Sequence, residues 1–135
     1  MRQLSLFKGK TQRGVAPAPP KEFQLHCMLA DTLKLCCSDR WRWTHLPMGE
    51  HRDIITASRL KRMGVQPGWP DFIFIGPGEV IFLELKRERS GRMSDHQSLL
   101  MAHLLACGCD YHISNNYDGA IAILAQYGIV PVRVR

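Results

Sequence analysis

Two predicted strands joined by a glycine and proline turn limit what this chain can fold into more than any other feature. The strands are Asp71–Ile75 and Val80–Lys86, and Gly76-Pro77-Gly78-Glu79 lies between them. Aromatic and β-branched residues on either side of such a turn predict a β-hairpin. Because consecutive positions are apolar, both faces of each strand must be buried against other parts of the protein. We therefore expect the hairpin at the centre of a sheet.

A symmetric turn fixes the register of this hairpin by opposing residues equally far from Pro77 and Gly78. The expected pairs are Ile75 with Val80, Ile73 with Phe82 and Asp71 with Glu84. Directly opposed residues have Cβ atoms about 5 Å apart on one face of the sheet. Lys86, two residues beyond Glu84, shares that face. The register therefore predicts two carboxylates and an ammonium at one end of an apolar sheet.

Opposed carboxylates repel each other unless a shared proton, a cation or the lysine neutralises them. A divalent ion does this well, and carboxylate and backbone oxygens are ligands that suit Mg²⁺ or Mn²⁺. Such an ion polarises a phosphoryl oxygen and lowers the pKa of bound water. The alternative is a structural salt bridge between Lys86 and the two acids.

The remaining periodicity predicts helices and strands around the hairpin. We expect helices over residues 21–36, 53–63, 94–107 and 118–127, and strands over 40–46, 110–114 and 129–134. Ser94-Asp95-His96-Gln97 has the form of a capping box that opens the third helix. The order favours an α/β or α+β domain with a mixed sheet. The length of 135 residues leaves room for one core, and we expect residues 1–20, which end in Val15–Pro20, to form a disordered tail.

Two segments around the hairpin carry a resemblance to a known family. Pro70-Asp71, followed after twelve residues by Glu84-Leu85-Lys86, resembles the PD-(D/E)XK nuclease signature. Arg59–Asp71 resembles the RLKxMGVxxGxPD stretch of the VRR-NUC (virus-type replication-repair nuclease) family. Glu84-Leu85-Lys86 with Gly91–Ser94 and Gln97 resembles that family's ElK…GrlS..Q segment, and Glu22 and Gln24 fit its early E..Q helix loosely. The resemblance covers about residues 21–130.

The resemblance implies a metal-dependent nuclease with a restriction-endonuclease-like α/β core. Its implied site residues are Asp71 and Glu84 as carboxylate ligands of Mg²⁺ or Mn²⁺, Leu85 as a carbonyl ligand, Lys86 as the group that serves the attacking water, Glu22 as the helix acid near the metal, and Gln97 as the family's glutamine at the start of the next helix. Gln97 can equally be the last member of the capping box. Glu22 can also be an acid that merely complements a helix N-terminus. Glu50 is a competing acid that we leave out.

A formal net charge of +6 suggests a polyanionic partner such as DNA. Basic residues flank the proposed site in the sequence and are candidates for phosphate contacts, which give affinity without reading bases: Arg52, Arg59, Lys61, Arg62, Arg87, Arg89 and Arg92. For any one of them, a solvated surface position is the alternative. We expect Trp69, beside the site, to pack rather than to stack on a base.

The N-terminal tail carries a second resemblance. Gln3-Leu4-Ser5-Leu6-Phe7 resembles the QL(S/D)LF pentapeptide of proteins that bind the bacterial sliding clamp. Such a peptide docks as an extended segment, with Leu6 and Phe7 as apolar anchors. The proline-rich stretch that follows would then tether the domain near DNA. A tail folded back onto its own core is the alternative.

The family resemblance implies a Mg²⁺-dependent, structure-selective DNA endonuclease of phage or bacterial replication or repair that acts on branched or flapped DNA as a homodimer. A non-cleaving DNA-binding accessory of the clamp is an alternative, as is a zinc-stabilised interaction module built on His103, Cys107, Cys109 and His112. No run of about 20 apolar residues predicts a membrane span, and the first residues lack the apolar core of a signal peptide. We therefore expect a cytoplasmic protein.

Overall fold

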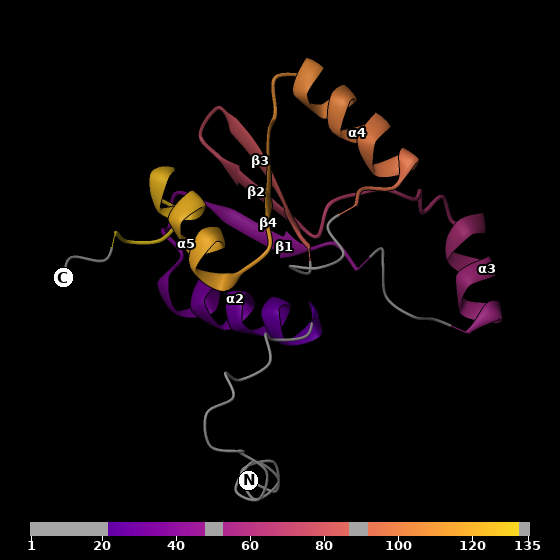
Figure 1. The fold of residues 1–135 in the computed structure, drawn as a ribbon, viewed down its shortest axis with the longest axis horizontal. Helices are drawn as coiled ribbons and strands as arrows, with labels where there is room; N and C mark the ends of the chain where they lie inside the picture. The colour runs from indigo at the N-terminus through magenta and orange to yellow at the C-terminus, as the bar shows by residue number, and fades with distance from the viewer. Residues whose placement is uncertain (1–21, 48–52, 87–91, 133–135) are drawn as a thin grey trace, which may run out of the picture.

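A four-stranded mixed sheet with four helices around it makes up the part of the chain that the computed structural model describes, residues 22–47, 53–86 and 92–132. The elements in chain order are α2 (Glu22–Cys36), β1 (Arg42–His45), α3 (Ile54–Arg62), β2 (Phe72–Gly76), β3 (Glu79–Leu85), α4 (Asp95–Ala106), β4 (Asp110–Ser114) and α5 (Tyr117–Gln126) (Figure 1). The strands follow the order β1-β2-β3-β4 across the sheet. The expected α/β architecture with a mixed sheet is confirmed.

The predicted hairpin occupies the centre of this sheet. β2 and β3 pair antiparallel, with Ile75 opposite Val80 and Ile73 opposite Phe82, as the symmetric turn requires. β1 continues the antiparallel arrangement on one side, and β4 runs parallel to β3 on the other. Gly78 adopts a φ of 74°, a left-handed conformation that costs glycine little and closes the turn. One step beyond the paired residues, the same register brings Asp71 to the level of Glu84.

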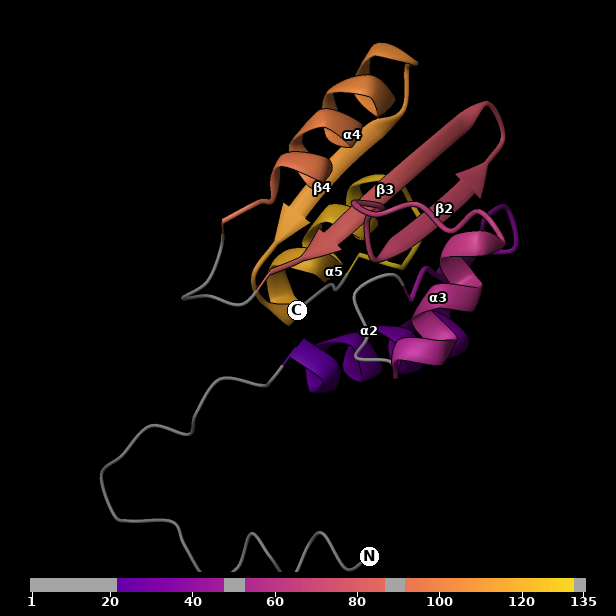
Figure 2. The ribbon, with the colours of Figure 1, turned by 90° about the vertical axis from the view of Figure 1, so that its right-hand side faces the viewer.

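One face of the sheet packs against α2 and α5, which lie on the opposite side from α4 (Figures 1 and 2). Three leucines at intervals of four residues give α2 its buried stripe. Alternate residues of β2 and β3 meet that stripe, and α5 closes the core beside it. The principal core residues are Leu25, Leu29, Leu33, Phe72, Phe74, Ile81, Leu83, Leu85, Ala120 and Leu124.

The opposite face of the sheet is covered by α4 and by the segment that leads into β2. α4 begins at Ser94, which caps the helix through the predicted box with Gln97. The ring of Trp69 packs beside Phe82, with ring centroids 6.0 Å apart, as expected. α3 differs from the other helices, because none of its residues is buried. Asp53 caps it by accepting a hydrogen bond from the Thr56 amide at 2.7 Å.

The strand predicted over residues 129–134 is wrong where the structure describes that segment. Residues 129–132 form no strand, although Ile129 and Val130 are buried in the core. The Ile129 amide donates to the Leu124 carbonyl, which closes the end of α5, and its carbonyl accepts from Ser38. Pro131 has no amide hydrogen to offer a neighbouring strand. The apolar residues of this segment are therefore buried where α5 ends, and they do not pair with a strand of the sheet.

None of the described helices is both long and apolar enough to cross a membrane.

Leu29 and Leu35 offer a matched test of the α2 packing, because they differ only in burial. Leu29 is 0% exposed, and Leu35 on the same helix is 86% exposed. We expect Leu29→Ala to lower the free energy of unfolding by about 2–5 kcal/mol, because it removes transfer energy and leaves a cavity. Leu35→Ala is expected to change it by less than about 0.5 kcal/mol. Urea denaturation measures both, and equal losses would contradict this packing of α2.

Candidate metal centre

Asp71 lies immediately before β2, and both strands that neighbour β2 in the sheet contribute contacts to it. Its carboxylate Oδ2 accepts a hydrogen bond from the backbone amide of Leu85, on β3, at 2.7 Å. Its backbone carbonyl accepts one from the Leu46 amide, also at 2.7 Å, beside β1. A ring nitrogen of His45, Nδ1, lies 2.8 Å from the same carbonyl. These contacts fix both the backbone and the carboxylate of Asp71 at the end of the sheet.

Glu84 is the buried acid of the site, and Gln97 holds it. The Glu84 side chain lies on β3 with the residue only 3% exposed, and its Oε2 accepts a hydrogen bond from Gln97 Nε2 at 2.9 Å. Gln97 Oε1 accepts from Lys86 Nζ at 2.9 Å and from the Ser94 amide at 3.0 Å. Gln97 therefore completes the helix cap and joins the site with one side chain. The capping role is confirmed, and the contacts with Glu84 and Lys86 place the same side chain beside the predicted site.

The surroundings of Asp71 and Glu84 shift the pKa values of the two carboxyl groups in opposite directions. Burial, together with a hydrogen bond shared with Asp71 and the charge of Asp71, raises the pKa of Glu84 to about 9, and Lys86 opposes this only in part. Burial also disfavours the charged form of Asp71. Interactions with His26 and Glu84 and the hydrogen bond from the Leu85 amide outweigh it and lower the pKa of Asp71. Both shifts favour a charged Asp71 beside a protonated Glu84.

Lys86 does not form the structural salt bridge considered as the alternative. Its Nζ donates to the amide oxygen of Gln97. Among the residues that the structure describes, the single contact within 4.0 Å between a basic side chain and a carboxylate is that of His26 Nε2 with Asp71 Oδ2, at 3.4 Å. The ammonium thus lies near Glu84 without neutralising the acidic pair.

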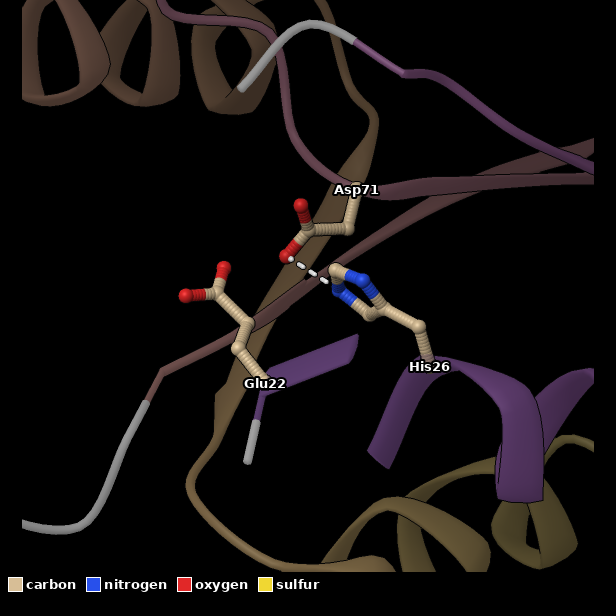
Figure 3. A group of neighbouring side chains, drawn as sticks. All are labelled: Glu22, His26 and Asp71. Carbon is tan, nitrogen blue, oxygen red and sulfur yellow. Dashed lines mark ion pairs between the residues drawn. The ribbon is translucent and has the colours of Figure 1, made fainter. Parts of the chain in front are cut away.

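The first two turns of α2 place the side chains of Glu22 and His26 at this site. Ligand atoms of Glu22, His26 and Asp71 all lie within 4.8 Å of one another. Figure 3 shows Glu22 and His26 projecting from α2 toward the carboxylate of Asp71. Glu22 was predicted for the site, and it does face Asp71. His26 was missed, although its position four residues after Glu22 places the two on one face of a helix and could have identified it.

Three of the predicted phosphate-binding residues lie on α3. Arg59, Lys61 and Arg62 are exposed in its last turns, and Arg92 is exposed before α4. Arg52, Arg87 and Arg89 lie outside the described residues, as do Glu50 and the proposed clamp-binding segment Gln3-Leu4-Ser5-Leu6-Phe7.

The zinc-stabilised alternative is not supported by the described residues. Cys107 Sγ lies 3.5 Å from His103 Nε2, but His112 contacts the Tyr127 hydroxyl instead. Within the described ranges, Glu22, His26 and Asp71 form the one group of three or more histidine, cysteine or acidic side chains close enough to share an ion. The cysteines in that part of the chain are free.

Comparison of the structure with solved structures identifies a similar fold. The chain matches a VRR_NUC domain protein with a TM-score of 0.62 and 20% sequence identity, over 82% of this chain and 90% of that one. A scan against family models and a search of curated protein sequences find no match. The protein therefore has the fold of a VRR_NUC domain, which agrees with the family that its motifs resemble.

Glu84 should make the metal-free protein less stable as the pH rises. Its pKa in the folded protein is about 9, above that of an unfolded glutamate, so the folded chain keeps a proton that the unfolded chain releases. Between about pH 5 and pH 9 this contribution to the free energy of unfolding falls with pH. We expect Glu84→Gln to remove it, so that wild type loses stability relative to the variant across this range. Urea denaturation in EDTA measures the difference in free energy of unfolding between wild type and variant. A difference that does not change with pH would contradict the raised pKa of Glu84.

Proposed function

We propose that this protein is a divalent-metal-dependent nuclease that hydrolyses phosphodiester bonds in DNA. One observation carries the proposal: the Asp71 carboxylate is fixed at the end of the sheet beside the buried acid Glu84, and Lys86 bonds to Gln97 and to neither acid. Buried acidic pairs with strongly perturbed pKa values are typical of functional sites. The pair lies in a fold similar to that of a VRR_NUC domain protein, and this similarity supports a nuclease function.

The residues at the site fit a divalent ion. Asp71 and Glu84 lie beside each other without a strong cation between them, and Glu22 adds a third carboxylate in a group with Asp71 that does not include Glu84. A divalent ion would take the place of the proton that Glu84 holds, and this substitution relieves the repulsion. Asp71, Glu84 and Glu22, with the carbonyl of Leu85, would hold Mg²⁺ or Mn²⁺. The ion, when bound, would supply a polarised phosphoryl oxygen and a more acidic water.

Lys86 would orient the attacking water or stabilise charge on the phosphate. Gln97 Oε1 holds its ammonium at 2.9 Å, and the same amide holds Glu84 through Nε2. Because the Ser94 amide also donates to Gln97 Oε1, the start of α4 fixes this side chain in one orientation. We assign Gln97 a positioning role: it sets the lysine and the glutamate relative to each other before substrate binds.

The exposed arginines and lysine of α3 support contact with the DNA backbone. Arg59, Lys61 and Arg62 lie a short segment before Asp71 in the chain, and no carboxylate within ion-pair distance pairs them in the described residues. Contacts of this kind position the duplex and carry no sequence information. Selectivity would then depend on the shape of the DNA.

The finer assignments depend on the sequence resemblances alone. They are endonucleolytic cleavage of branched DNA in phage or bacterial replication or repair, a homodimer, a cytoplasmic site of action, and attachment to the sliding clamp through residues 3–7. The non-cleaving accessory remains the competing proposal. The set Asp71, Glu84 and Lys86 favours cleavage, because a protein that only binds DNA has no need of a buried acidic pair.

Replacing Asp71 tests the catalytic proposal. We expect Asp71→Asn to lower the rate of cleavage at least about a hundredfold in Mg²⁺ or Mn²⁺, because the loss of a metal ligand removes several kcal/mol of transition-state stabilisation. Binding to DNA should remain. The measurement is a panel of labelled single-strand, duplex, flap, splayed-arm and four-way DNA substrates.

Asp31→Asn is the control, since Asp31 is an exposed acid on α2. It should cut like the wild type. Undiminished cleavage by Asp71→Asn would place the catalytic site elsewhere, and a wild type that cuts none of the substrates would favour the non-cleaving accessory.

The salt dependence of DNA binding tests the role of α3. We expect Arg59→Ala/Arg62→Ala to reduce the slope of log K against log salt by about two, because about one counterion fewer is released per lost phosphate contact. Lys34→Ala/Arg40→Ala removes the same charge from exposed positions far along α2 and beyond its end, and it should leave the slope unchanged. Binding measured in EDTA at several salt concentrations decides this. Equal effects of the two double variants would show general attraction and no contact at α3.

A further inference from the structure

We propose that His26 is a nitrogen ligand of the metal centre and makes the centre prefer a transition ion such as Mn²⁺ to Mg²⁺. This inference rests on the proposed function, because it concerns the same ion. It adds an imidazole to a ligand set that the sequence motifs describe with oxygen ligands alone.

The position of His26 fits a shared ion. Nε2 lies 3.4 Å from Asp71 Oδ2, and an oxygen of Glu22 completes a group within 4.8 Å. Two ligand atoms about 2.1 Å from one ion and at right angles lie about 3 Å apart. The imidazole and the carboxylate therefore have nearly the spacing of neighbouring ligands. Figure 3 shows all three side chains converging from α2 and from the start of β2.

The Nε2 atom of His26 has no other satisfactory partner. It is buried, and no hydrogen bond to it forms within the described part of the chain. Its contact with Asp71 Oδ2 is an ion-pair contact at 3.4 Å, and that oxygen already accepts from the Leu85 amide at 2.7 Å. A buried polar nitrogen without a partner is costly. A cation bound between the imidazole and the two carboxylates would remove that cost.

Packing holds the ring of His26 in this orientation. The ring of His45 lies on one side with centroids 5.0 Å apart, and that of Phe72 lies 5.7 Å away. The side chain is only 18% exposed. The two rings restrict the rotamers of His26, so its nitrogen would be placed before an ion arrives. A ligand held in advance costs less entropy on binding.

The chemistry of imidazole gives the metal preference. Mg²⁺ is a hard ion that takes oxygen ligands and retains water, whereas transition ions accept imidazole nitrogen readily. A centre with three carboxylates alone would give little advantage to Mn²⁺. The same centre with His26 should bind Mn²⁺ distinctly more tightly than Mg²⁺.

Electron spin-echo spectroscopy of the Mn²⁺-loaded protein tests this directly, because it detects nitrogen bonded to the ion. We expect a ¹⁴N modulation in the wild type that changes to a ¹⁵N pattern when the protein is made with ¹⁵N-histidine. His26→Gln should abolish the modulation and weaken Mn²⁺ binding about tenfold more than Mg²⁺ binding, both measured by calorimetry. His103→Gln, at an exposed histidine on α4, is the matched control and should change neither.

The outcomes separate this inference from the proposed function. Mn²⁺ bound without nitrogen modulation, or a modulation that survives in His26→Gln, would overturn the inference alone, provided that Asp71-dependent cleavage persists. A wild type that binds neither ion and cuts no DNA would overturn both. If His26→Gln does not fold, the isotope experiment on the wild type still shows whether a histidine is bonded to the ion, and His26→Asn serves as the second variant that assigns the signal to His26.

Discussion

A charged carboxylate held against a backbone amide at the end of an apolar sheet is the interaction on which the site depends. Asp71 Oδ2 accepts from the Leu85 amide across the hairpin, so the paired strands themselves position the acid. Burial of Glu84 beside it, together with the charge of Asp71, raises the pKa of Glu84 to about 9. Gln97 bonds to Glu84 and Lys86, and Glu22 and His26 lie close to the carboxylate of Asp71.

Gln97 connects the site to the helix that covers the sheet. Its amide closes the capping box at Ser94 and also bonds to Glu84 and Lys86. A substitution at this position would therefore affect the start of α4 and the geometry of the site together. A single amide can do this because it offers donors on one atom and an acceptor with two lone pairs on the other.

α2 likewise combines a structural face with a functional one. Leu25, Leu29 and Leu33 bury one stripe against the sheet. Glu22 and His26, in the first two turns, reach the carboxylate of Asp71. Because the helix is anchored along its length by the leucines, its N-terminal end is held at a fixed place relative to β2. The core thus sets the distance between the imidazole and the acid.

The features that the sequence by itself determined are those governed by short spacings. Alternation and the turn determined the register of the hairpin and hence the pairing of Asp71 with Glu84, and a four-residue pattern determined the capping box at Ser94. Tertiary structure alone decided that His26 faces Asp71, that Lys86 bonds to Gln97, and that Ile129 ends a helix in place of forming a strand. It also decided that burial raises the pKa of Glu84. These outcomes depend on which elements pack together and how much water they exclude, and local patterns of residues do not encode either quantity.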